Sequence, residues 1–152
     1  MSGPGDPFEA NAWDEPPFTS LERVMFAWEE SVEREEPWCT MPVDDRRGEL
    51  RRVLEELLDP ANGIDAPTRR RRLETAAYGH GAFRRGQRCS EVTLSHDLIV
   101  LRDALKRALR AGGASHTTAR DLVRQLLPDW HLARRAARSG YNEARIVRDS
   151  TS

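Results

Sequence analysis

Two histidines on either side of a short turn are the side chains best suited to chemistry in this sequence. His80 lies in "AAYGHGAFRRG" and His96 in "CSEVTLSHDL". A turn near Arg88 joins two segments of helical periodicity, so the two imidazoles are predicted at the same height of an antiparallel hairpin, where they could hold a metal or haem. His96, however, lies two residues from both Leu94 and Leu98. It therefore points away from their stripe, and the two rings are not expected to converge.

His80 itself is predicted to point into the core. Gly79 and Gly81 each cost about 1 kcal/mol in a helix interior, which close packing of a neighbouring helix would offset. We expect a neutral, buried imidazole that donates its ring proton to a carbonyl or hydroxyl across this contact. Two alternatives stay open. His80 could respond to pH because burial lowers its proton affinity, or it could bind haem or a small molecule in an interhelical pocket with Phe83 and Leu98.

Other signs of catalysis or metal binding are weak. The sequence contains no GxSxG, no phosphate-binding glycine loop and no HExxH. Cys39 and Cys89 show no CxxC spacing, and the glutamates of residues 29–36 form a charged run at a helix end. We therefore predict neither an enzyme nor a bound metal or cofactor.

The charges are distributed unevenly along the chain. Residues 1–45 carry twelve acidic and two basic side chains, and residues 46–152 carry thirteen acidic and twenty-two basic ones. The two parts are expected to attract each other, which favours internal docking over nucleic-acid binding. The run of four arginines at residues 69–72 would point around its helix rather than form one face, so nucleic acid is the less favoured partner. The acidic end of the first helix is one candidate to neutralise it.

Apolar residues recur with helical spacing, and no segment alternates like a strand. The sequence predicts an all-α, single-domain bundle of five to six helices within residues 19–145, possibly globin-like. A disordered acidic arm with aromatic residues is predicted at 1–18 and a disordered tail at 146–152. No apolar run reaches the roughly 18 residues that would span a membrane, and no signal peptide precedes the arm. A cytoplasmic location without membrane contact is expected.

Residues typical of helix starts and stops set the predicted boundaries. These are a Thr19–Glu22 capping box before a helix ending near Glu36; Asp44 or Asp45 before the stripe of Leu50, Val53, Leu54, Leu57 and Leu58; Asp65 and Gly86 around the third helix; Ser90 and Gly112 around the fourth; and a last helix from about Thr117 that Pro128 kinks or splits.

A helix face left over after one core is built would give a homodimer interface. The candidates for it are Trp28, Leu122, Leu126 and Trp130. Asp97 and Arg102 stand five positions apart and so form no standard helical pair. Arg102 is expected to reach a carboxylate on another helix instead.

Residues 76–110 resemble the N-terminal domain of RsbRD-type RsbT co-antagonist proteins, a sensory module that also begins some bacterial histidine kinases. The features that carry the resemblance are His80, Arg84 or Arg85, Gly86, Ser90, Asp97 and the Leu101–Arg102 pair, with Trp28 early and Tyr141 late in the chain. The sequence departs from the family at Thr93, at Asp97 in place of a glutamate and at Leu98 in place of an aromatic residue.

The resemblance implies a globin-like or bundle-like helical input domain that binds no haem, dimerises and transmits signals by helix movement. The leading hypothesis is therefore a non-catalytic bacterial signalling or regulatory domain, a free-standing sensory or adaptor module that contacts a signalling protein. The alternative is a haem or small-molecule sensor that uses His80. Nucleic-acid binding through the arginine-rich helix is the third hypothesis.

Overall fold

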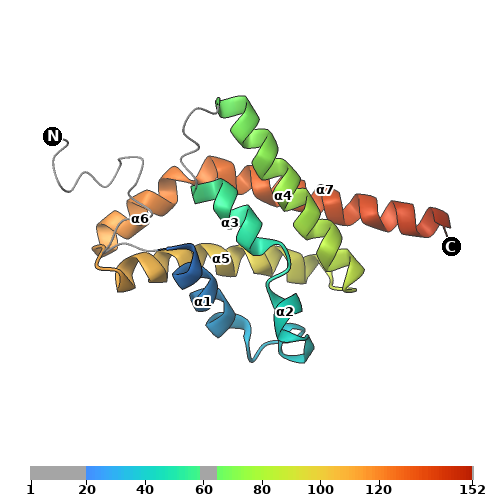
Figure 1. Ribbon diagram of the computed structural model, residues 1–152, viewed down its shortest axis with the longest axis horizontal. Helices are drawn as coiled ribbons and strands as arrows, with labels where there is room; N and C mark the ends of the chain where they lie inside the picture. The colour runs from blue at the N-terminus through green and yellow to red at the C-terminus, as the bar shows by residue number, and fades with distance from the viewer. Residues whose placement is uncertain (1–19, 59–64, 152) are drawn as a thin grey trace.

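The computed structural model describes residues 20–58 and 65–151, with the side chains of residues up to 144, and these ranges are helical without any strand (Figure 1). The predicted all-α class is confirmed, whereas the predicted arm of residues 1–18 lies outside the described residues. The α-helices are α1 (Leu21–Val32), α2 (Val43–Arg46), α3 (Leu50–Leu58), α4 (Ala66–Gly86), α5 (Glu91–Ala111), α6 (His116–Gln125) and α7 (Leu127–Thr151), with a 3-10 turn, η1 (Trp38–Thr40). The seventh helix, absent from the prediction, is the single turn α2.

The helices pack in pairs around one buried apolar cluster. α4 crosses α7 in the most extensive contact, α1 packs along α5, and α3 packs on α4 (Figure 1). The four residues predicted as a dimer face all lie in this cluster, exposed by 7% or less: Trp28, Leu122, Leu126 and Trp130. The core of one chain therefore already covers the face that the sequence assigned to a second copy.

Several predicted helix ends are confirmed by their cap contacts. The Asp65 carboxylate accepts a hydrogen bond from the Thr68 amide at 2.7 Å, and the Ser90 hydroxyl accepts one from the Thr93 amide at 3.1 Å. Gly112 caps α5, and the predicted split at Pro128 separates α6 from α7. Proline fits there because a backbone N–H in the first turn of a helix has no intrahelical acceptor.

The predicted ends of the first helix are wrong, whereas the end predicted at Gly86 is confirmed. Ser20, not Thr19, caps α1, and the helix ends at Val32 because the acidic residues after it are unfavourable at a helix C-terminus. Gly86 is the last residue of α4, and the left-handed conformation in the following turn belongs to Arg88, with φ +63°.

Two further expectations for the chain are corrected. Asp44 and Asp45 lie inside α2 and do not cap α3. α7 continues to Thr151, through most of the predicted tail of residues 146–152. Within the described residues, no helix is long and apolar enough to span a membrane.

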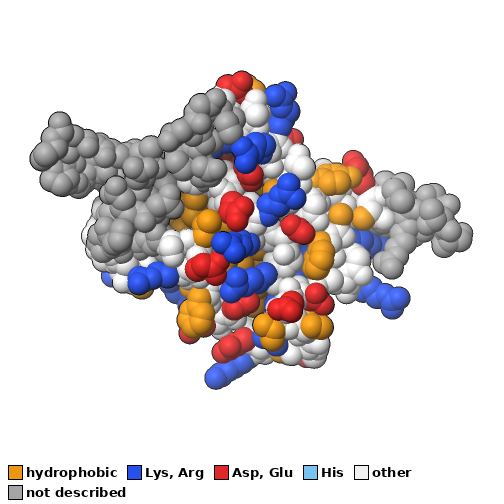
Figure 2. All heavy atoms as spheres, viewed as in Figure 1, with side chains coloured by type: hydrophobic (Ala, Val, Ile, Leu, Met, Phe, Trp, Pro, Cys, Tyr) orange, Lys and Arg blue, Asp and Glu red, His pale blue; other side chains and the backbone are white. Residues whose placement is uncertain are grey.

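The predicted attraction between the acidic N-terminal part and the basic remainder is seen as ion pairs. Arg47 lies 2.7 Å from Glu29 and 3.6 Å from Glu22, and Arg51 lies 2.9 Å from Glu22. Around α1 and α3, acidic and basic side chains accordingly alternate on the face shown in Figure 2. These pairs join α1 to the start of α3.

The arginine run finds partners other than the predicted end of the first helix. Arg69 lies 3.6 Å from Asp129 of α7, and Arg72 lies 3.1 Å from Glu56 of α3. Two of the four arginines thus contribute to contacts between helices.

Candidate functional site

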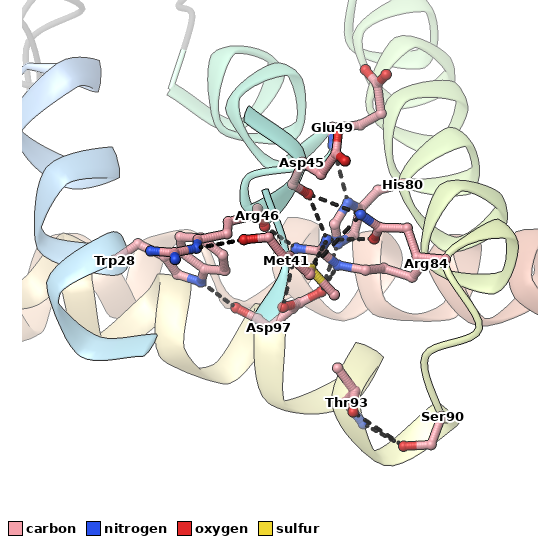
Figure 3. A network of polar contacts seen from close by, with 11 residues as sticks. Trp28, Met41, Asp45, Arg46, Glu49, His80, Arg84, Ser90, Thr93 and Asp97 are labelled. Atoms are coloured by element: carbon pink, nitrogen blue, oxygen red, sulfur yellow. Dashed lines mark hydrogen bonds and ion pairs between the residues drawn. The ribbon is translucent and has the colours of Figure 1, made fainter. Parts of the chain in front are cut away.

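A buried polar cluster joins α1, α4, α5 and the segment before α3 (Figure 3). Its centre consists of His80, Arg84 and Asp97, the three fully buried polar or charged side chains among the described residues. His80 and Arg84 stand one turn apart on the inward face of α4, and Asp97 faces them from α5. The hairpin of α4 and α5 therefore brings the three side chains together.

The contacts of His80 fix its tautomer. Its Nδ1 atom accepts a hydrogen bond from the backbone N–H of Glu49 at 3.2 Å, and its Nε2 atom lies 3.0 Å from Oδ2 of Asp97. Because an amide N–H can only donate, Nδ1 carries a lone pair, and Nε2 donates its proton to the carboxylate. The neutral, buried imidazole of the prediction is confirmed, although its acceptor is a carboxylate rather than the expected carbonyl or hydroxyl.

Arg84 is the cationic member of the cluster and is held by charge-assisted hydrogen bonds. Its Nε donates to Oδ2 of Asp97 at 2.6 Å, its Nη1 donates to Oε1 of Gln87 at 2.7 Å and to the carbonyl of Asp45 at 3.2 Å, and its Nη2 donates to the carbonyl of Arg46. One guanidinium thus ties α4 to α5 and to α2.

Asp97 connects this group to α1. Its backbone carbonyl accepts a hydrogen bond from Nε1 of Trp28 at 3.2 Å, and Trp28 in turn packs edge-on against Trp38, with ring centroids 6.3 Å apart. The cluster therefore fixes how α1, α4 and α5 sit against one another.

Gly48 closes the cluster over the imidazole. It adopts φ +53°, and a Cβ at this position would lie 3.0 Å from Nδ1 of His80. Glycine therefore suits this position both in conformation and in space, and it lets the Glu49 amide reach the ring.

The buried position of His80 makes the stability of the fold depend on pH. Burial lowers the pKa of His80 below its ordinary 6.5 and outweighs Asp97 and Glu49, which raise it, while Arg84 lowers it further. Just below pH 6.5, the unfolded chain therefore binds a proton at His80 that the folded chain does not. The free energy of unfolding has its full value above pH 6.5. We expect it to fall toward pH 5 by at most about 1.4 kcal/mol per pH unit.

Urea unfolding between pH 5 and 8 measures this dependence against a matched control. His80→Gln is expected to flatten the loss of stability below pH 6.5, because no imidazole remains to be protonated. His116→Gln, at an exposed position of α6, should keep the wild-type profile. An unchanged profile in His80→Gln would show that His80 does not set the dependence.

Phe83 and Leu98, the residues predicted to form a ligand pocket with His80, do not line a common pocket with it. Phe83 is 37% exposed beside Gly48, and Leu98 lines a groove toward α7. Both ring nitrogens of His80 already have hydrogen-bond partners, so a metal or haem iron would have to displace one. His96 bonds to Glu35 instead, as expected for rings that do not converge.

The remaining residues of the predicted motif have local roles. Ser90 caps α5, Gly86 is exposed, and Arg102 is half-buried outside the cluster. Asp97 pairs with Arg84, one of the two residues that the resemblance gave as the arginine of the motif. A sequence signal for both existed, since Arg84 is four residues after His80 on its apolar stripe, and Asp97 stands between Leu94 and Leu101 on theirs.

Within the described residues, no three histidine, cysteine or acidic side chains converge as metal ligands would. Comparison of the chain with models of protein families, with curated proteins and with solved structures finds no match.

Proposed function

We propose that this protein is a non-catalytic regulatory domain of bacterial signalling, a cytoplasmic sensory or adaptor module that acts by protein contact. A single helical domain, globin-like or bundle-like in arrangement, and a homodimeric state belong to the same proposal. The resemblance of residues 76–110 to the N-terminal domain of RsbRD-type co-antagonists supports it. So does the closed state of the buried cluster, which is the observation that carries the proposal.

The burial and internal hydrogen bonds of the cluster are typical of a group that stabilises helix packing and not of an active centre. His80, Arg84 and Asp97 are fully buried, and their polar atoms bond to the protein itself. A general acid or base has to come within hydrogen-bond distance of its substrate, and these buried side chains give a substrate no such access. Their contacts instead specify one arrangement of α1, α4 and α5, and such an arrangement can be biased by a partner that binds at the surface.

Affinity capture with quantitative mass spectrometry from cells of the source organism tests the proposal. We expect a stoichiometric protein partner, together with a dimer mass in light scattering of the purified chain. A strict monomer at high concentration that captures no specific partner would contradict it.

A haemin titration distinguishes the sensor alternative. The wild type is expected to show no sharp Soret band, since both nitrogens of His80 are engaged. A one-equivalent band that His80→Ala abolishes would replace the adaptor proposal with a haem sensor.

A further inference from the structure

A groove of about 300 Å³ lies between the start of α5 and the middle of α7. Its α7 wall consists of His131, Arg134, Arg135 and Arg138, which we call the basic stripe. Leu94 and Leu98 of α5 are buried in the adjoining core and give the groove an apolar side. It thus combines a cationic wall with an apolar floor.

The spacing of the basic stripe matches one face of a helix. Its members stand at positions i, i+3, i+4 and i+7, so they run along about 10 Å of α7 in two turns. All four side chains are exposed, whereas the face of α7 that packs on the core carries Trp130, Ala133, Ala137 and Tyr141. The basic stripe is therefore accessible to a partner, and its positive charge is complementary to an acidic surface.

The stripe is unpartnered within the part of the chain that the structure describes. None of its three arginines makes an ion pair or hydrogen bond there, although Arg47, Arg69, Arg72 and Arg84 all pair with carboxylates elsewhere. The single carboxylate in the lining, Glu91, leaves the wall with a clear positive excess.

One end of the groove is firmly held. The Tyr141 hydroxyl, one turn beyond Arg138, donates to the carbonyl of Cys89 at 2.7 Å and accepts from Nη1 of Arg85 at 3.0 Å. These bonds anchor α7 to the turn between α4 and α5. The groove is therefore preformed, which lowers the ordering cost of binding.

We propose that this groove binds an acidic amphipathic helix of a partner protein. Carboxylates at the same i, i+3, i+4, i+7 spacing would pair with the basic stripe, and an apolar side chain would contact Leu94 and Leu98. The inference rests on the proposed function, since it names the surface through which the protein contacts its partner. The positive charge of the basic stripe is the reason for assigning the groove to an acidic helix.

Nucleic acid fits the same groove less well. The lining offers no phenylalanine, tyrosine or tryptophan on which a base could stack, and Glu91 would repel a row of phosphates. A phosphate backbone also has no apolar group that would contact the apolar floor of the groove.

Fluorescence anisotropy with the full chain tests the proposal. The probe is a labelled helical peptide of about fifteen residues, with glutamates at i, i+3, i+4 and i+7 and leucines beside them. We expect it to bind at least about tenfold more tightly than the same peptide with glutamines, and to weaken as salt rises. The double variant Arg135→Glu, Arg138→Glu should weaken binding at least about tenfold. Arg124→Glu, at an exposed arginine of α6, should change it less than about twofold.

Three outcomes of the anisotropy measurements would overturn the assignment. These are equal binding of the acidic and neutral peptides, an equal effect of Arg124→Glu, and tighter binding of single-stranded DNA that is lost in the double variant. Capture of the cellular partner with the double variant separates this inference from the proposed function. If the variant retains the partner, the groove is not the contact surface, while the adaptor function stands.

Discussion

Asp97→Asn is expected to lower the free energy of unfolding by about 3 to 5 kcal/mol. The substitution keeps the shape of the side chain but removes the charge that balances the Arg84 guanidinium, which is fully buried and 2.6 Å from Oδ2. A buried charge that has lost its partner retains the cost of leaving water without the compensating attraction. The Nε2–H of His80 would also lose its charged acceptor. Urea unfolding followed by far-ultraviolet circular dichroism measures the loss.

The matched control is Asp103→Asn, at an exposed position on the same helix. It should change stability by no more than about 0.5 kcal/mol, as surface substitutions do. In a double-mutant cycle, Arg84→Met and Asp97→Asn together should cost less than the sum of their separate effects, by about 0.5 to 3 kcal/mol. Additive losses would show that the two residues do not act as a pair.

The features predicted correctly from the sequence depend on local interactions. The caps at Asp65 and Ser90 are determined by a side chain and an amide three residues away, and Pro128 acts through its own missing N–H. The burial of His80 followed from its place in an apolar stripe. Each of these required no knowledge of how one helix is rotated against another.

The polar cluster could be predicted only in part because its partners come from distant segments. The placement of Arg84 and Asp97 on apolar stripes is a signal from which their burial could have been predicted, but their pairing depends on the rotation of α4 against α5. The carbonyls of Asp45 and Arg46 and the amide of Glu49 carry no signature at all, because every residue has a backbone. Only the folded path of residues 41–49 brings these groups to the cluster.

The dimer face was mispredicted for a related reason. Helical periodicity shows that a helix has an apolar face but does not show what covers it. Trp130 and Leu122 are covered by the other helices of the same chain. Counting apolar residues could not separate a core of one chain from an interface between two.

The two glycines beside His80 are expected to respond in opposite directions to alanine, although the sequence suggested close packing at both. A Cβ at Gly81 would lie 1.8 Å from the carbonyl oxygen of Ala137 on α7, whereas a Cβ at Gly79 meets nothing within 4 Å. Positions two apart on a helix face roughly opposite sides, so only one of them can lie in the crossing. Gly140 of α7 lies in the same crossing, because a Cβ there would lie 2.0 Å from the carbonyl oxygen of Tyr78 on α4.

Gly81→Ala should lower the free energy of unfolding by at least about 2 kcal/mol, because the methyl group meets backbone and the two helices have to move apart. Gly79→Ala should raise it by up to about 1 kcal/mol, since alanine is the better helix former in open space. Urea unfolding of the two variants beside the wild type measures both signs in one experiment. If Gly81→Ala were as stable as the wild type, α4 and α7 would not cross in contact at this residue. If Gly79→Ala were destabilised equally, the loss would reflect the helix itself and not the crossing.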